Sequence, residues 1–114
     1  MMRDAGTGDV RLSVIIPTYN CKAYLKECLN SVSSQLPEDC EVIAVDDGSD
    51  DGTAELLSSY PGTRKNLRVL LRAHRGASGA RNAGLAAARG SFVTFLDCDD
   101  RLQQGFLEKS LPML

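Results

Sequence analysis

The chain has 114 residues, of which 43% are hydrophobic and 25% are charged, and its formal net charge at pH 7 is -2. This composition is ordinary for a single globular domain and excludes a fibrous or intrinsically disordered protein. A net charge so close to zero gives no overall attraction to nucleic acid, so we expect no nucleic-acid partner.

The first residues contain no unbroken apolar stretch of the kind found in signal peptides, and no later run is long enough to span a membrane. We therefore expect a flexible tail at residues 1–11 and a cytoplasmic location, with membrane association left open for a longer parent protein. The cysteines lie in or beside apolar segments without C-x-x-C spacing, as is typical of reduced structural thiols, and they are Cys21, Cys28, Cys40 and Cys98.

Short apolar runs predict four strands, at residues 12–16, 41–45, 67–71 and 92–96, with Pro17 ending the first. Helical patterns separate these runs. The first helix is capped by Asn20 and carries its apolar stripe up to residue 32, the second is a short one that ends near Tyr60, and the third covers residues 80–89 and stops at Gly90. A turn is expected at residues 61–62, and residues 103–114 are typical of a helix that is cut short by truncation.

Strands that are apolar on both faces and alternate with helices indicate an α/β protein with a mostly parallel sheet of about four strands and helices on both faces. In such sheets, ligands bind beyond the carboxyl ends of the strands. A polar cluster follows three of the predicted strands, at residues 17–20, 46–52 and 97–100. The clusters are therefore expected to meet at one edge of the sheet.

The segment Phe95-Leu96-Asp97-Cys98-Asp99-Asp100 runs from a strand directly into carboxylates. Alternate residues of an extended chain point the same way, so Asp97 and Asp99 can face one divalent cation, which would relieve the repulsion between them. A polar strand end with Asp100 opening the next helix explains the same spacing equally well.

The segment Asp46-Asp47-Gly48-Ser49-Asp50-Asp51-Gly52-Thr53 has the early positions of a calcium-binding EF-hand loop, but Ser58 stands where that loop needs a bidentate Glu. A capped turn accounts for Asp50 and Asp51, which can face the amino end of the following helix. It does not account for Asp46 and Asp47, whose position at the end of a buried strand would let an acceptor reach a base amide or ribose hydroxyls.

The segment from His74 to Leu85 contains glycines that allow close backbone approach, and its Arg75 and Arg81 could meet a diphosphate near a helix start. It is neither a P-loop nor a dinucleotide-binding fingerprint. We interpret His74 as a surface loop residue, because no nucleophilic Ser or Cys accompanies it.

Together these segments resemble the family 2 glycosyltransferases, over nearly the whole chain from Ser13 onward. Each motif alone is common, whereas four in this order are specific. They are Ser13-Val14-Ile15-Ile16-Pro17-Thr18-Tyr19-Asn20, Val45-Asp46-Asp47-Gly48-Ser49 with Asp51-Gly52-Thr53, Gly79-Ala80-Arg81-Asn82-Ala83-Gly84-Leu85, and Phe95-Leu96-Asp97-Cys98-Asp99-Asp100.

The resemblance implies a Rossmann-like GT-A fold, with residues 12–114 forming the amino-terminal, nucleotide-sugar-binding part of a hexosyltransferase domain. Such enzymes pass a sugar from a nucleoside diphosphate, usually UDP, to an acceptor hydroxyl with inversion. The implied nucleotide-sugar site comprises Pro17, Thr18, Tyr19, Asp46, Asp47, Arg81 and Asp97.

Roles follow from the same resemblance. Tyr19 would stack on the base, Asp47 would read the base edge, and Arg81 would lie near the base and phosphates. Asp99 would be the direct ligand of Mn²⁺ or Mg²⁺, with Asp97 at the ribose or at a metal-bound water. A divalent cation suits this reaction chemically, because it stabilises the departing nucleoside diphosphate.

Complete domains of the family are longer, so the acceptor-binding half and the catalytic general base are expected to be absent, and the isolated chain is expected to transfer sugar poorly or not at all. The sugar and the acceptor, whether glycan, lipid or protein, stay open. One alternative is a truncated, non-catalytic nucleotide-binding or interaction module that forms homo-oligomers through its unfinished sheet. Another is half of a dehydrogenase or methyltransferase, which the missing glycine fingerprint disfavours.

Overall fold

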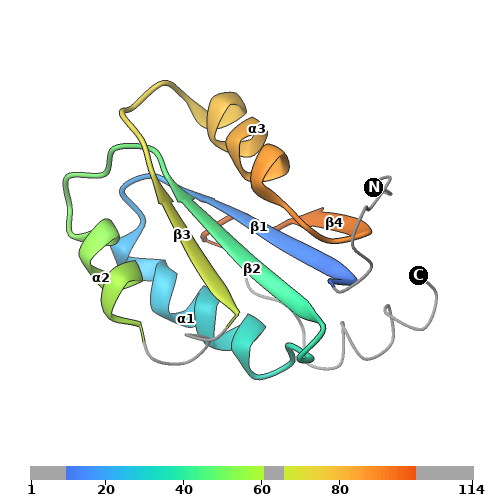
Figure 1. The fold of residues 1–114 in the computed structure, drawn as a ribbon. Helices are drawn as coiled ribbons and strands as arrows, with labels where there is room; N and C mark the ends of the chain where they lie inside the picture. Colours follow the sequence, from blue (N-terminus) through green and yellow to red (C-terminus); the bar gives the residue numbers. More distant parts are fainter. Residues whose placement is uncertain (1–9, 61–65, 100–114) are drawn as a thin grey trace.

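The computed structural model describes residues 10–60 and 66–99 (Figure 1). The predicted tail up to residue 9, the turn at 61–62, Asp100 and the helix at 103–114 lie outside the described residues. The described elements are, in chain order, β1 (Leu12–Thr18), α1 (Lys22–Ser33), β2 (Cys40–Asp46), α2 (Thr53–Ser59), β3 (Leu67–Leu71), α3 (Ala77–Ala87) and β4 (Phe92–Phe95).

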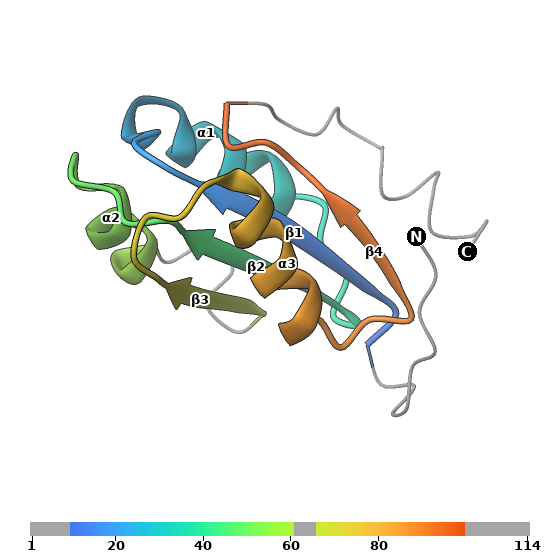
Figure 2. The same cartoon turned by 90° about the horizontal axis from the view of Figure 1, so that it is seen from above.

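The strands form one parallel sheet in the order β3-β2-β1-β4, which confirms the predicted fold class. Figures 1 and 2 show α1 and α2 on one face of the sheet and α3 on the other. The chain thus moves outward from β1 to β3 and then returns across the sheet to place β4 on the other side of β1. This reversal creates a switch point at the carboxyl ends of β1 and β4, where parallel sheets of this kind bind ligands.

The core has two layers because both faces of the central strands are apolar. Alternate residues of β1 and β2 point to opposite faces, so Ile15 packs under α3 while Val14 and Ile16 pack under α1. The layer beneath α1 and α2 includes Leu12, Val14, Ile16, Leu25, Leu29, Val32, Val42, Ala44 and Leu57. The layer beneath α3 includes Ile15, Ile43, Val45, Ala80, Ala88 and Val93.

Strand β1 is longer than predicted, since it continues through Pro17 to Thr18. Pro17 is paired in register with Val45 of β2, whereas the pairing with β4 ends at Ile15. A proline lacks an N–H donor, but at this position β1 has already passed the end of β4. The strand therefore carries Pro17 and Thr18 to the edge where the polar clusters gather.

The prediction that Asn20 caps α1 is wrong. The residue before the helix is Cys21, and Asn20 has a left-handed backbone with a φ of 48°. The Asn20 side chain accepts a hydrogen bond from the Asp50 amide at 2.9 Å, which ties it to the loop after β2. Asp51 on that loop instead accepts the Lys22 amide at 3.2 Å.

The predicted capping role of Asp51 is confirmed. Its carboxylate also accepts the Thr53 amide, at 3.0 Å, so one side chain serves the first turns of both α1 and α2. The Thr53 hydroxyl, which donates to this carboxylate, holds the pKa of Asp51 below its usual value, and the Lys22 and Thr53 amides help it to outweigh the opposing effect of burial.

Helix α3 begins at Ala77, three residues before the predicted start, and it ends at Ala87. Gly90 does not terminate it. A side chain at Gly90 would lie 2.6 Å from the Ser13 amide nitrogen, so this glycine is required for a close approach between the start of β4 and β1. Val10 and Arg11, predicted as part of the tail, also pair with this region by accepting backbone hydrogen bonds from Ser91 and Phe92.

A buried carboxylate, that of Glu41, joins the strands at their amino ends, opposite the end where the polar clusters gather. Glu41 accepts hydrogen bonds from the Ser13 hydroxyl at 2.6 Å, the Arg89 amide at 2.8 Å and the Arg68 guanidinium at 3.0 Å. Its burial alone would raise the pKa, but these donors outweigh burial and lower the pKa of Glu41. The polar network therefore fixes this end of the sheet and leaves the other end for a ligand site. Within the described ranges, no helix has the length and apolar character needed to cross a membrane.

Candidate functional site

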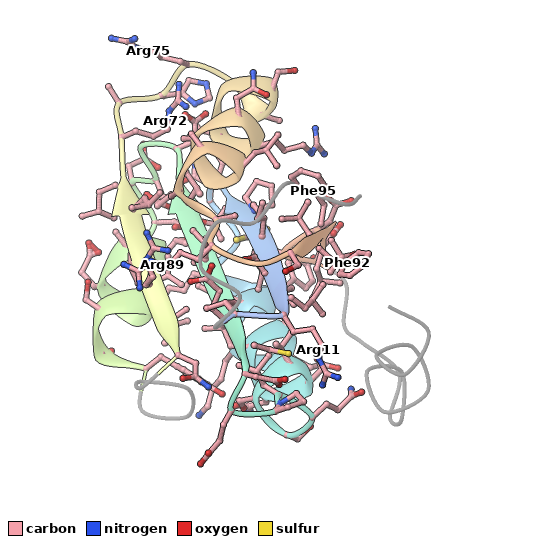
Figure 3. All side chains as sticks on the ribbon, turned by 45° about the vertical axis from the view of Figure 1, so that its right-hand side comes forward. Arg11, Arg72, Arg75, Arg89, Phe92 and Phe95 are labelled. Atoms are coloured by element: carbon pink, nitrogen blue, oxygen red, sulfur yellow. The ribbon has the colours of Figure 1, made fainter. Side chains whose placement is uncertain are left out.

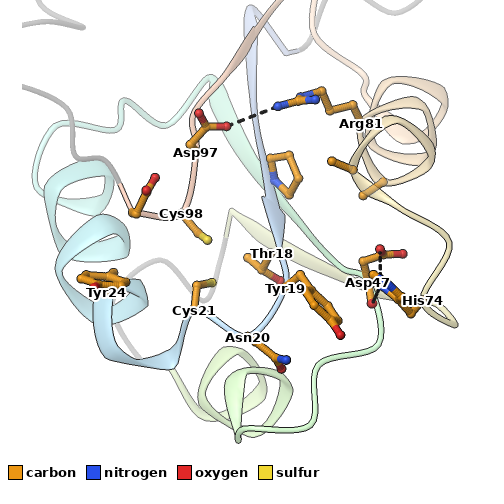
Figure 4. Close-up of a pocket in the computed structure, with 14 residues that line it drawn as sticks. Thr18, Tyr19, Asn20, Cys21, Tyr24, Asp47, His74, Arg81, Asp97 and Cys98 are labelled. Atoms are coloured by element: carbon orange, nitrogen blue, oxygen red, sulfur yellow. Dashed lines mark hydrogen bonds and ion pairs between the residues drawn. The ribbon is translucent and has the colours of Figure 1, made fainter.

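A pocket of about 470 Å³ opens at the carboxyl ends of β1 and β4 (Figure 4). It lies at the switch point of the sheet, where the predicted polar clusters were expected to meet. Its wall is formed by Pro17, Thr18, Tyr19, Asn20, Cys21, Tyr24, Asp47, His74, Ala77, Ala80, Arg81, Asp97, Cys98 and Asp99.

Most of the residues predicted for the site therefore share one cavity. The residues that were predicted and that line the pocket are Pro17, Thr18, Tyr19, Asp47, Arg81, Asp97 and Asp99. Asp46 is the exception, since it lies outside the pocket wall formed by the described residues. Arg75, suggested beside Arg81, also lies outside that wall, and Figure 3 shows its side chain extending away from the body of the protein.

Asp47 holds the loop between β3 and α3. Its carboxylate accepts hydrogen bonds from the amides of Arg75 at 3.0 Å and Gly76 at 2.9 Å. The Arg72 Nε lies 3.3 Å from Oδ1, and the His74 Nδ1 lies 2.9 Å from Oδ2. Burial would raise the pKa of Asp47, but the two amides and the neighbouring positive groups hold it below its usual value. The carboxylate is thus an ionised anchor at one end of the pocket.

An aromatic pair lies beside this anchor. The rings of Tyr19 and His74 stack with their centroids 4.2 Å apart and an angle of 22° between their planes. The tyrosine is 46% exposed, so part of its surface is open to a ligand. His74 does lie on a loop, as predicted, but it forms part of the pocket rather than a plain surface. The signal that could have identified it is its position, three residues beyond the end of β3 at the ligand-binding edge.

Asp46 lies outside the pocket wall but forms hydrogen bonds to residues at the pocket. Its side chain accepts hydrogen bonds from the Thr18 hydroxyl at 2.8 Å and from the Ser49 hydroxyl at 2.6 Å, and it is only 3% exposed. The Ser49 amide donates to its other oxygen at 3.0 Å. Asp46 therefore fixes the orientation of Thr18, which does line the pocket, and the turn that follows β2.

At the other end of the pocket, Arg81 on α3 faces the carboxylate that follows β4. Arg81 Nη2 and Asp97 Oδ1 lie 3.5 Å apart, and their side chains are 43% and 59% exposed (Figure 4). An ion pair this exposed contributes about 0–1 kcal/mol, so either partner is free to exchange the contact for a ligand. Asp99 is also part of this end of the wall.

The donor set at this end fits a hard divalent cation that is completed by a ligand's phosphates. Among the described residues no group of three or more His, Cys, Asp or Glu side chains converges on one point, so the protein alone forms no closed metal cage there. Mg²⁺ is commonly held by one or two carboxylates together with substrate phosphates, and Asp97 and Asp99 supply that kind of set. Carboxylate oxygens suit Mg²⁺ and Mn²⁺ alike.

The fold and the pocket define an α/β protein with a ligand site at the switch point of a parallel sheet. Residues 13–114 match the sequence model described as glycosyl transferase family 2, so the chain belongs to that family. The match covers all four motifs on which the resemblance was based.

Named glycosyltransferases are similar in sequence to most of this chain. Glycosyltransferase GlyA of Streptococcus pneumoniae serotype 4 is 35% identical over 100 residues, which cover 88% of this chain and 14% of GlyA. Glycosyltransferase GlyG of the same organism is 35% identical over 98 residues, covering 85% of this chain and 33% of GlyG. The chain therefore spans less than half the length of these relatives.

Solved structures agree with the family and define the fold. S. aureus TarS, residues 1–349, is 37% identical to this chain with a TM-score of 0.80, over 89% of this chain and 31% of the TarS chain. The TarS complex with UDP-GlcNAc superposes with a TM-score of 0.81 at 36% identity, over 89% of this chain and 30% of the TarS chain. The described part of the chain thus has the GT-A fold that the sequence predicted.

Proposed function

We propose that this chain is the donor-binding part of an inverting glycosyltransferase that uses a nucleoside diphosphate sugar, with UDP as the nucleotide. The observation that carries the proposal is one pocket with an aromatic platform and an anchored carboxylate at one end and an arginine with two aspartates at the other. That order matches a base followed by a diphosphate. Support comes from TarS, which has been solved with UDP and with UDP-GlcNAc.

The base is proposed to stack on the open part of Tyr19, with Thr18 and Pro17 beside it. Asp47 is proposed to read the base edge. Its carboxylate accepts two backbone amides, and Arg72 Nε and His74 Nδ1 lie close to it as well, at 3.3 Å and 2.9 Å. A carboxylate offers about four lone-pair positions, and the two that the amides leave face the Arg72 and His74 side chains, so a base N–H is proposed to displace one of these side chains. His74 is the candidate to give way, because its side chain is 55% exposed whereas that of Arg72 is 23% exposed.

The diphosphate is proposed to bind at the other end, between Arg81 and a cation held by Asp99 and Asp97. A guanidinium gives phosphate two parallel hydrogen bonds, and it becomes available when the weak contact with Asp97 is released. The cation, Mn²⁺ or Mg²⁺, would supply positive charge for the phosphates of the leaving nucleotide.

No protein nucleophile is needed for a direct displacement with inversion. The acceptor hydroxyl would attack the anomeric carbon as the nucleoside diphosphate departs, and a general base would take its proton. We propose that the acceptor site and this base belong to the part of the family domain that this chain does not span, and that the chain alone binds donor without efficient transfer.

The test is calorimetric titration of UDP into the full chain, with and without Mn²⁺. Wild type is expected to bind UDP in a metal-dependent manner, and Asp99→Ala is expected to lose that dependence because the direct ligand is gone. Asp50→Ala is the matched control, since Asp50 is an exposed aspartate in the loop after β2 rather than in the pocket wall. UMP, which lacks the second phosphate, should bind with little metal dependence. Equal metal-dependent binding by wild type and Asp99→Ala would refute the proposed metal role.

A further inference from the structure

Two cysteines face one another inside the pocket, although they come from opposite ends of the chain. Cys21 follows β1 and precedes α1, and Cys98 follows β4. Cys21 belongs to the core layer beneath α1, and Cys98 packs against the same layer. Figure 4 shows both sulfur atoms pointing into the space between these two segments. Both residues are free cysteines and both belong to the pocket wall.

The backbone holds this pair in place from both sides. The Cys21 amide donates to the Thr53 hydroxyl at 3.1 Å, and the Cys21 carbonyl accepts the amides that open α1. On the other side, the amide of Leu96 donates to the carbonyl of Ile15 at 2.9 Å, which fixes the end of β4 against β1 two residues before Cys98. Both cysteines are therefore held in the packed switch point.

The two residues also differ in exposure. Cys21 is 5% exposed, whereas Cys98 is partly open to solvent. Because the pocket opens at this edge, a small reagent can reach Cys98 first, and the resulting adduct would lie against Cys21. Thiol–disulfide exchange proceeds through a mixed disulfide and depends on access to the attacking sulfur, so a more exposed cysteine beside a second one suits both of its steps.

We propose that Cys21 and Cys98 form a dithiol modification site that closes to an intramolecular disulfide when the protein meets a small-molecule disulfide such as oxidised glutathione. The sulfur of Cys98 attacks one sulfur of the reagent, forms a mixed disulfide and releases the first reagent thiol. The sulfur of Cys21 then attacks the Cys98 sulfur and releases the second reagent thiol. Two protein thiols are oxidised by two electrons, the reagent disulfide is reduced to two thiols, and the two protons pass to those thiols.

The disulfide would tie the start of α1 to the segment that carries Asp97 and Asp99. If the pocket binds UDP with a cation, as proposed above, that segment must adjust when Asp97 exchanges Arg81 for the ligand. A bond at Cys98 would resist this adjustment. Oxidised protein is therefore expected to lose metal-dependent UDP binding, and a reducing agent is expected to restore it.

Peptide mapping of the oxidised full chain tests the bond itself. Trypsin cleaves after Lys and Arg, so Cys21 falls in peptide 12–22 and Cys98 in peptide 90–101, while Cys28 and Cys40 share a third peptide. After oxidised glutathione and alkylation of remaining thiols, the expected product is peptide 12–22 joined to peptide 90–101. The intact protein should lose two hydrogen atoms in mass and carry no glutathione.

Variants separate this pair from the other thiols. Cys21→Ser should stop at a stable glutathione adduct on Cys98, and Cys98→Ser should give no linked peptides. Cys40→Ser, which removes a buried thiol at the start of β2, should form the linked pair like wild type. A disulfide that joins either cysteine to Cys28 or Cys40, or a persistent glutathione adduct on wild type, would overturn the proposal. Formation of the disulfide in protein that fails to bind UDP would support the modification site and refute the proposed donor site.

Discussion

Asp47 shows how much one carboxylate contributes to this pocket. It anchors the chain between β3 and α3 through two backbone amides, and it holds Arg72 and His74 against the end of β2. Because these contacts are made to the ionised carboxylate, they lower its pKa in the folded protein despite its burial. The order of the loop between β3 and α3 therefore depends on pH, because it depends on the ionised carboxylate of Asp47.

Replacing Asp47 by Asn is expected to loosen this loop, because the neutral amide has only one acceptor oxygen and no attraction for Arg72. Amide hydrogen exchange at Arg75 and Gly76 should become faster, and the melting temperature at pH 7 should fall. The pKa is lowered on folding, so the stabilisation is present above the usual value of 3.8 and is lost as the pH falls through the folded-state value.

The difference in melting temperature between wild type and Asp47→Asn should accordingly shrink below pH 3.8. Asp50→Asn is the control, since it makes the same chemical change at an exposed position and should leave both exchange rates unaltered. A difference that stays constant as the pH falls would show that the charge of Asp47 is not what orders the loop.

The neighbouring residues Asp46 and Asp47 show which feature of the site could not be predicted from the sequence. Asp46 and Asp47 both follow a buried strand, so the sequence predicts that both leave it at the ligand edge. Which one faces the pocket depends on the turn after them, where Gly48 has a φ of 78° and where a side chain would lie 2.7 Å from the His74 amide nitrogen. That contact joins residues far apart in the sequence, and for the same reason the local pattern could not predict that the exposed loop residue His74 also lines the pocket.

At the scale of elements, α3 packs on the sheet with a glycine, Gly84, against the central strands, where a side chain would not fit. A Cβ atom at Gly84 would lie 2.4 Å from Ile15 Cγ2 and 3.2 Å from Val45 Cγ2. Both neighbours are fully buried, and neither has free space to move into. The helix therefore sits at a distance that a larger residue would not allow, and this distance also places Arg81 at the pocket.

Gly84→Ala should destabilise the protein although alanine favours helices. The gain in helix propensity is about 1 kcal/mol, whereas overpacking a core costs about 1–3 kcal/mol. We expect a net loss of about 1 kcal/mol in the free energy of unfolding, measured by urea denaturation. Asn82→Ala on the exposed side of α3 should instead raise stability slightly, because it changes only propensity. A Gly84→Ala protein as stable as Asn82→Ala would contradict the close packing.

The central strands β1 and β2 could be predicted from sequence because both their faces are buried, which makes each a nearly continuous apolar run. The outer strands β3 and β4 are less buried, but they are short and rich in apolar residues as well. The ends of the helices could not be predicted as well. The start of α1 is capped by Asp51 from a different loop, and the start of α3 follows Gly76, whose φ of 104° reverses the chain before Ala77. In both cases the decisive partner or backbone angle comes from the tertiary arrangement rather than from the local pattern.

At the scale of the whole molecule, the pocket depends on the assembled four-stranded sheet. Its wall takes residues from the ends of β1, β2 and β4, from the loop after β3 and from α3. None of these segments carries the site alone, and they meet only at the switch point of the folded sheet. A ligand of this pocket must therefore bind the native state and not the unfolded chain.

UDP with Mn²⁺ is accordingly expected to stabilise the whole domain by mass action. Ligand at one hundred times its dissociation constant adds about 2.7 kcal/mol to the free energy of unfolding when it binds only the native state. Thermal unfolding should shift to higher temperature as the UDP concentration rises, by an amount that follows the logarithm of that concentration. Asp99→Ala should shift far less, while Asp50→Ala should behave like wild type. A shift of equal size with Mn²⁺ alone would mean that the cation binds independently of the nucleotide, and the shared site of nucleotide and metal would then be wrong.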